Sequence, residues 1–300
     1  MDRVKLIAFA EATAAVIVWG ASFIATKVAL RDVSPVTVVW LRFAMGVVII
    51  GVAVVARKQF AFVPLKELGY FALLGFVGIT LHQWLQSNGL VTAQATTTAW
   101  IVATTPIFMA VLGWMLLKER FEWPLVAGIA AAAFGVLLVA TKGDFGSLTA
   151  GRFGAPGDFL ILISAPNWAL FSALSRRGLG RHPAARMMFY VMTLGWAFTS
   201  VMLFAGPGLS EIPRLTLNGW LGVGFLGVFC SGLAYIFWYD ALQVIPASQL
   251  AVFLYVEPLV AVVVAAAILR ERITPPALLG GAIILFGVWI VNRPTRSSTD

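Results

Sequence analysis

Polar and aromatic side chains recur at helical spacing inside stretches of the chain that are otherwise apolar. His82 and Gln86 are four residues apart, which places them on one face of a helix, and Thr97 and Trp100 share a face of the next apolar stretch. Because an unsatisfied polar group in lipid is costly, such side chains must face protein or water. The spacing therefore predicts a polar cavity enclosed by helices.

The candidate cavity faces mix rings with hydrogen-bonding groups. Rings stack on an apolar side chain, while amides and hydroxyls replace water around a charged head group, so these faces suit a small amphipathic solute with a zwitterionic head. The candidate solute-binding residues are Trp19, Ser22, His82, Gln86, Thr97, Trp100, Trp168, Tyr235, Tyr239, Gln249 and Phe253.

Structural roles compete with these assignments. Serine and threonine in membrane helices often bond back to their own backbone, and this is the expected role of Ser164, Ser175, Thr26 and Thr104. Tryptophans near the ends of apolar stretches anchor helices at the bilayer surface. His82 fits either a neutral histidine satisfied by one neighbour or a cavity residue linked to a proton.

Two charged residues lie within apolar stretches. Glu257, next to Pro258, is the candidate for proton coupling, because a buried carboxyl charges only when it is wetted or paired. Arg42 is expected to pair with a carboxylate or to extend toward the bilayer surface. Pro106, Pro166 and Pro258 interrupt backbone hydrogen bonds within apolar stretches and are candidate hinges.

The composition indicates which kind of structure carries these residues. Of the 300 residues, 60% are hydrophobic and 11% are charged, too few polar residues to cover a soluble chain. Apolar stretches near the twenty or so residues that cross a bilayer as a helix follow one another, and their continuous apolarity argues against a β-barrel. The ten expected spans are 6–29, 35–56, 67–89, 93–116, 122–141, 157–175, 183–205, 217–241, 246–268 and 275–292.

Several classes of protein are disfavoured. The single cysteine, Cys230, offers no disulfide framework and no metal set, and nucleotide-binding loops are absent, so no cofactor and no metal are expected. An intramembrane enzyme stays open as an alternative, with His82 and Glu257 as its only testable pairing. The net charge of +8 is spread between apolar stretches rather than gathered on one face, so no nucleic-acid partner is expected. Lys and Arg favour placing both termini in the cytoplasm.

The chain repeats itself. Leu117, Glu119, Arg120 and Pro124 recur as Leu269, Glu271, Arg272 and Pro276 at one constant offset (271 − 119 = 152), and Gly128, Phe134, Gly135 and Val136 recur as Gly280, Phe286, Gly287 and Val288. Residues 1–150 and 151–300 are therefore expected to form two units, inverted relative to one another because five spans each is an odd number. Glu119 and Glu271 are expected to cap the helices that follow them.

These motifs carry a resemblance. Trp19-Gly20-Ala21-Ser22-Phe23, Leu41-Arg42-Phe43 and the twin Glu-Arg…Gly…Phe-Gly-Val tracts are similar to the drug/metabolite transporter superfamily, more narrowly to its ten-helix EamA group and to YddG-type aromatic amino acid exporters. The second unit departs from the pattern, with Ala169 after Trp168 and Pro166 in mid-span.

The resemblance implies an all-α integral membrane protein, two inverted five-helix repeats around a central cavity. Its expected function is export of small amphipathic metabolites, above all aromatic and other neutral amino acids, by alternating access in the bacterial inner membrane. The alternative is a nucleotide-sugar or phosphate-ester carrier of the same superfamily. Since four-helix relatives work as dimers and the duplication here replaces that dimer, a functional monomer is expected.

Overall fold

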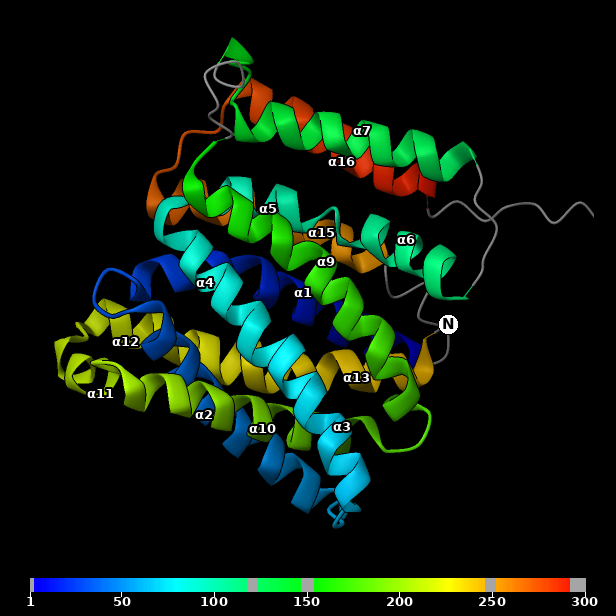
Figure 1. The fold of residues 1–300 in the computed structure, drawn as a ribbon, viewed down its shortest axis with the longest axis vertical. Coiled ribbons are helices and arrows are strands. Elements are labelled where there is room, and N and C mark those ends of the chain that lie inside the picture. The colour runs from blue at the N-terminus through cyan, green and yellow to red at the C-terminus, as the bar shows by residue number, and fades with distance from the viewer. Residues whose placement is uncertain (1–2, 118–122, 147–153, 246–251, 292–300) are drawn as a thin grey trace, which may run out of the picture.

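The computed structural model describes residues 3–117, 123–146, 154–245 and 252–291, and the ordered elements among them are helices (Figure 1). The first half of the chain contributes α1 (Arg3–Ala29), α2 (Pro35–Ala56), α3 (Leu65–Gly75), α4 (His82–Thr92), α5 (Ala95–Val102), α6 (Thr105–Leu117) and α7 (Trp123–Ala140). The second half contributes α9 (Pro156–Leu179), α10 (Ala184–Ala205), α11 (Gly208–Glu211), α12 (Leu217–Gly224), α13 (Ala234–Val244), α15 (Val256–Val264) and α16 (Pro275–Val291).

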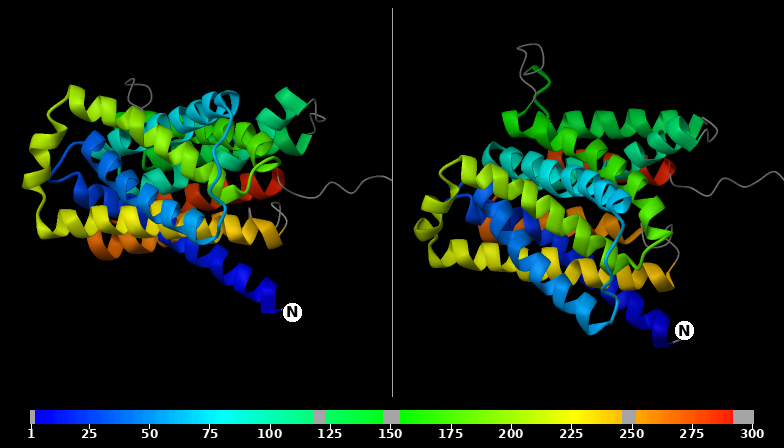
Figure 2. Two further views of the ribbon diagram at one scale, coloured as in Figure 1. Left: turned by 90° about the horizontal axis from the view of Figure 1, so that it is seen from below. Right: turned by 60° about the horizontal axis from the view of Figure 1, so that its bottom comes forward.

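Within the described residues, seven helical segments are long and apolar enough to cross a membrane. They are Arg3–Ala29, Pro35–Ala56, Leu65–Thr92, Ala95–Leu112, Pro156–Leu179, Ala184–Ala205 and Leu217–Val244, and shorter apolar helices cover Val126–Ala140, Phe253–Leu269 and Pro275–Val291. The prediction of an all-helical membrane protein is confirmed. Both views of Figure 2 show the N-terminal end of α1 projecting beyond its neighbours, and the side chains of Leu6 and Ile7 there are about half exposed.

Two long segments widen into π-helix part-way along. The wider turns are η1 (Phe76–Leu81), between α3 and α4, and η3 (Phe225–Leu233), between α12 and α13. The two segments overlap when the first is shifted by the offset of the sequence repeat. A π turn rotates the helix face that follows it, so η1 changes which side chains of α4 point inward.

Two further interruptions of the helices occur just before prolines that are equivalent in the sequence repeat. The helix breaks between α5 and α6 just before Pro106, and the 3₁₀ turn η4 (Val252–Tyr255) gives way to α15 just before Pro258. Thr104 and Thr105 donate hydroxyl hydrogen bonds of 2.6 and 2.7 Å to the Ile101 and Val102 carbonyls, which satisfies backbone oxygens at the break. By contrast, α9 continues through Pro166 without a break.

Glycine faces bring α7 and α16 together. A methyl carbon at Gly135 would lie 2.6 Å from the Gly280 carbonyl oxygen, and one at Gly287 would lie 2.7 Å from the Gly128 carbonyl oxygen. Such short distances require glycine. Because Gly128 meets Gly287 while Gly135 meets Gly280, the two helices run antiparallel, and Figure 1 shows them side by side along one edge of the molecule.

The two halves also exchange helix contacts reciprocally. In the first half α3 packs on α10 of the second half, where Gly75 meets the backbone of Gly195. In the second half η3 packs on α2 of the first, where Gly227 meets Met45. Gly75 and Gly227 are equivalent in the sequence repeat, so each half supplies the same kind of surface to the other.

One expectation about capping is wrong. The Glu271 carboxylate accepts hydrogen bonds from the backbone N–H groups of Ala95 and Thr96, at 2.9 and 3.0 Å, and from the Thr96 hydroxyl at 2.8 Å. It therefore caps α5, in the other half of the chain, rather than the helix that follows it. The sequence places Glu271 beside α16, but the fold brings this turn to the start of α5. Glu119 lies outside the described residues.

Candidate functional site

A single buried guanidinium lies at the contact between the two halves. Arg42, on α2, is 5% exposed. Its Nε donates to the Ser231 hydroxyl of η3 at 3.0 Å, and its Nη1 donates to the Gln83 side-chain oxygen of α4 at 2.9 Å. Arg42 thus ties together three segments from both halves of the chain.

The charge of Arg42 has no opposite partner in the described part of the chain. There the ion pairs are Arg57–Asp240, Arg181–Glu67 and His182–Glu67, none of which includes Arg42. The expected carboxylate partner is therefore replaced by two neutral oxygens. A guanidinium carries five N–H donors, and Gln83 and Ser231 take two of them, which leaves Nη2 and one N–H of Nη1 for a further acceptor.

Aromatic rings from α1 and α13 lie on one side of this cation. The Trp19 ring centroid is 5.6 Å from that of Tyr235 and 5.3 Å from that of Trp238, and Tyr235 lies 6.3 Å from Tyr239. The Trp19 indole N–H is fixed by a 3.1 Å hydrogen bond to the Cys230 carbonyl. These rings form an apolar wall held in one orientation.

A second group of rings comes from α4 and α9. The His82 ring lies 4.8 Å from Trp168, which in turn lies 5.0 Å from Phe171. His82 is adjacent in sequence to Gln83, the acceptor of the Arg42 hydrogen bond, and its Nδ1 is buried without a hydrogen-bond partner among the described residues. An unsatisfied imidazole nitrogen next to a cation leaves hydrogen-bonding capacity in the site.

Five of the predicted site residues belong to these two groups of rings: Trp19, His82, Trp168, Tyr235 and Tyr239. Arg42, Gln83 and Ser231 are the polar centre of the site, and the sequence reasoning did not include them among the binding residues. A signal for Arg42 was present, because it is the only Lys or Arg deep within an expected span. Gln83 and Ser231 carry no such signal.

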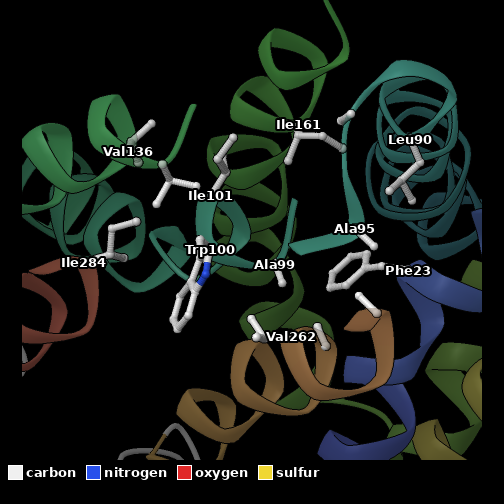
Figure 3. Close-up of a cluster of buried hydrophobic side chains, with 14 of the residues drawn as sticks. Phe23, Leu90, Ala95, Ala99, Trp100, Ile101, Val136, Ile161, Val262 and Ile284 are labelled. Atoms are coloured by element: carbon white, nitrogen blue, oxygen red, sulfur yellow. The ribbon is translucent and has the colours of Figure 1, made fainter. Parts of the chain in front are cut away.

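Trp100 lies elsewhere. It is 2% exposed and its ring presses against Gly281 of α16, where a side chain has no room. Figure 3 shows the ring among Ala99, Val262 and Ile284, in the apolar core that joins α5 to α15 and α16. Its indole N–H has no partner among the described residues. The surroundings of Trp100 are those of a packing residue.

The remaining predictions are scattered. Phe253 stacks on Phe9 of α1 at 5.7 Å, in a separate small core with Ala8, Ala12 and Ala241. Thr97 lines a different hollow. Ser22 accepts the hydroxyl of Thr26 through its backbone carbonyl at 2.8 Å, and Gln86 is half-buried on α4. Gln249 lies outside the described residues.

Glu257 occupies the first turn of α15, where its backbone carbonyl meets Gly20 of α1. Its side chain is half-buried and makes no hydrogen bond to the described residues. Gly20 directly follows Trp19 in α1, so Glu257 lies close to the aromatic group that contains Trp19.

A bidentate ion pair follows the end of α2. The Arg57 guanidinium donates to the two Asp240 carboxylate oxygens at 2.6 Å each, and both residues line a small cavity together with Tyr235 and Tyr239. The hydrogen bonds from Arg57 to Asp240 raise the pKa of this arginine. The ion pair therefore joins the first half of the chain to the second beside the aromatic wall.

Comparison with known proteins identifies the family. A sequence profile of the EamA-like transporter family matches residues 7–141 and again residues 155–293. The chain belongs to the EamA-like transporter family. Two copies of the EamA unit account for nearly its whole length, and they fall on the two halves of the internal repeat.

Relatives of this EamA protein are transporters. An uncharacterized transporter of Archaeoglobus fulgidus is 27% identical over 92% of this chain and 95% of its own length. A probable terminal-alkyne amino-acid exporter of Streptantibioticus cattleyicolor is 27% identical over 93% of this chain and 91% of its own. The uncharacterized transporter YdfC of Bacillus subtilis is 26% identical over 90% and 86%. A solved structure with 21% identity superposes with a TM-score of 0.66 over 96% of this chain and 95% of that one, which supports the fold.

Proposed function

We propose that this EamA protein exports small amphipathic metabolites, chiefly aromatic and other neutral amino acids, by alternating access. The observation that carries the proposal is the buried Arg42 guanidinium with two neutral partners and aromatic rings nearby. An uncompensated cation in a membrane interior is costly, and a solute carboxylate removes that cost. Trp19, Tyr235 and Trp168 supply apolar surface for a side chain.

The charge distribution of the site favours a zwitterion. Arg42 offers donors for a carboxylate, while Glu257, whose backbone packs against Gly20 beside Trp19, offers an acceptor for an ammonium group. Glu257 is also the proposed proton-coupling residue, because its carboxyl has no hydrogen-bond partner in the described part of the chain. The amino-acid exporter among the relatives agrees with this choice of solute.

The proposed architecture has ten membrane helices in two inverted repeats, 1–150 and 151–300, with both termini in the cytoplasm of a bacterial cell and the protein acting as a monomer. Support comes from the antiparallel contact of α7 with α16 and from the reciprocal contacts of Gly75 and Gly227. The breaks before Pro106 and Pro258 supply equivalent hinges in each half, whereas Pro166 lies in a continuous helix. Inverted halves exchange roles to open the site to either side.

Two rival functions fit the structure less well. A phosphate-ester carrier needs several free cations at the site, but Lys27, in the last turn of α1, donates to the Leu90 and Ala93 carbonyls at 3.3 and 2.5 Å. An intramembrane enzyme built on His82 and Glu257 needs the two side chains together, yet His82 packs on Trp168 of α9 while Glu257 lies against α1.

Transport assays in liposomes containing the purified protein test the proposal. Labelled phenylalanine, threonine and a nucleotide sugar are offered at equal and at unequal pH across the membrane. Amino-acid flux that is lost in Arg42→Gln supports the function, and a pH-gradient response lost in Glu257→Gln adds proton coupling. Flux of the nucleotide sugar without flux of either amino acid overturns the assignment.

A further inference from the structure

A second hollow lies away from the Arg42 site, at the end of the molecule where α1 ends. Its volume is about 430 Å³, and it is enclosed by the end of α4, the start of α5, the end of α7 and the start of α9. The polar residues that line it include Thr92, Gln94, Thr97, Lys142, Asp144 and Asp158. Its size fits a single amino acid, since small-molecule pockets begin at roughly 300 Å³.

The deepest polar group in this hollow is Asp158. The residue is 3% exposed, and its Oδ2 accepts the backbone N–H of Ala155 at 2.7 Å, which caps the start of α9. Its Oδ1 is buried and has no hydrogen-bond partner among the described residues. A buried carboxylate oxygen without a partner calls for a ligand, because leaving it unpaired costs free energy.

The rest of the lining complements that oxygen. The Thr97 hydroxyl and the Gln94 amide line the same hollow, and neither takes part in a hydrogen bond with the described residues. Lys142, at the end of α7, contributes an exposed cation. Acceptors at the bottom of the hollow and a cation at its rim match an ammonium group and a carboxylate on one small solute.

We propose that this hollow is a second solute site that binds a zwitterion, with Asp158 Oδ1, Thr97 and Gln94 holding the ammonium group and Lys142 facing the carboxylate. The choice of an amino acid as its solute rests on the function proposed above; the ammonium site itself rests on Asp158.

Binding of phenylethylamine to the purified full-length protein tests the ammonium site without using transport. This probe keeps the ring and the ammonium group of phenylalanine and has no carboxylate for Arg42. Asp158→Asn preserves an oxygen for the Ala155 cap and replaces the unpaired acceptor with a donor. We expect it to weaken phenylethylamine binding at least tenfold, while Asp32→Asn, a matched change of a helix-capping aspartate outside the hollow, leaves that binding within about twofold of wild type.

Equal binding by wild type and Asp158→Asn overturns the second site, and so does loss of binding in Asp32→Asn alone. Thermal unfolding of each variant shows that it is folded. Phenylalanine binding then gives the stoichiometry: two per chain in wild type, and one in either Arg42→Gln or Asp158→Asn. If phenylethylamine binding depends on Asp158 but phenylalanine shows no flux, the proposed function fails while the ammonium site stands.

Discussion

At the scale of single residues, the central feature of the candidate site is the buried charge of Arg42. Its guanidinium is buried between α2, α4 and η3, and its two protein partners, Gln83 and Ser231, are neutral. Removing one partner of a buried charge lowers stability more than removing a surface contact does, because the remaining charge stays desolvated. We therefore expect a carboxylate that pairs with Arg42 to stabilise the site.

Substitutions at Trp168 and Trp100 should affect different properties of the protein, solute transport in the first case and stability in the second. Trp168→Ala removes a ring that contacts His82 beside the Arg42 group, so we expect amino-acid flux to fall at least tenfold with a small change in stability. Trp100→Ala removes a ring packed on Gly281, and we expect it to lower the free energy of unfolding by about 3 kcal/mol. Flux in liposomes and thermal unfolding of the same samples measure both effects. The reverse pattern would contradict the placement of the two rings.

The site was only partly predictable at this scale. Periodicity groups polar side chains into helix faces, and it places His82 with Gln86. It does not say which face turns inward, and the π turn η1 rotates α4 so that Gln83 rather than Gln86 meets Arg42. The sequence also does not show that the Trp100 ring packs on Gly281, because the two residues are far apart in the chain.

At the scale of helices, the two halves of the sequence repeat contain helix irregularities at equivalent positions. The π turns η1 and η3 and the breaks before Pro106 and Pro258 recur at equivalent places. These features follow from local sequence and were partly predictable from the prolines. The Glu271 cap on α5 was not, because it depends on two segments that only the fold brings together.

The α7–α16 contact tests the role of the glycines in helix packing. Gly135→Ala puts a methyl group against the Gly280 carbonyl, and we expect a loss of about 2 kcal/mol in the free energy of unfolding. Gly224→Ala is the matched control, because a methyl group on this α12 glycine meets no atom within 4 Å. There alanine should be neutral or stabilising. Equal loss in both variants would show that the close approach contributes nothing.

At the scale of the whole molecule, the two halves are tied at both ends of α2. At its start, Glu211 of the second half accepts from the Ser34 backbone N–H at 2.9 Å and from the Thr37 hydroxyl at 2.8 Å. At its end, Arg57 pairs with Asp240. The proposed alternating access would require such contacts to loosen in turn, so we expect their strength to affect how easily each side opens.

The Glu211 contact should respond to acid. Burial opposes ionisation of this carboxyl, but the hydrogen bonds from Ser34 and Thr37 outweigh it and lower its pKa. A lowered pKa in the folded protein gives stability that is present above the ordinary glutamate pKa, about 4.3, and is lost as the pH falls below it. Between pH 7 and pH 4, the free energy of unfolding should therefore fall more in wild type than in Glu211→Gln, by at most about 1 kcal/mol. Thermal unfolding at both pH values measures this difference. Identical acid sensitivity of the two proteins would contradict this.

The most direct test of the whole account compares phenylalanine with phenylalaninamide, which lacks the carboxylate, in equilibrium binding to wild type and to Arg42→Gln. Hydrogen bonds to a charged group contribute about 1.5–3 kcal/mol, so wild type should prefer phenylalanine by roughly tenfold or more. Arg42→Gln should lose that preference, and Arg42→Lys, which keeps the charge, should retain part of it. An Arg42→Gln protein that is folded and still prefers phenylalanine as strongly as wild type would contradict the assignment of Arg42 as the carboxylate site.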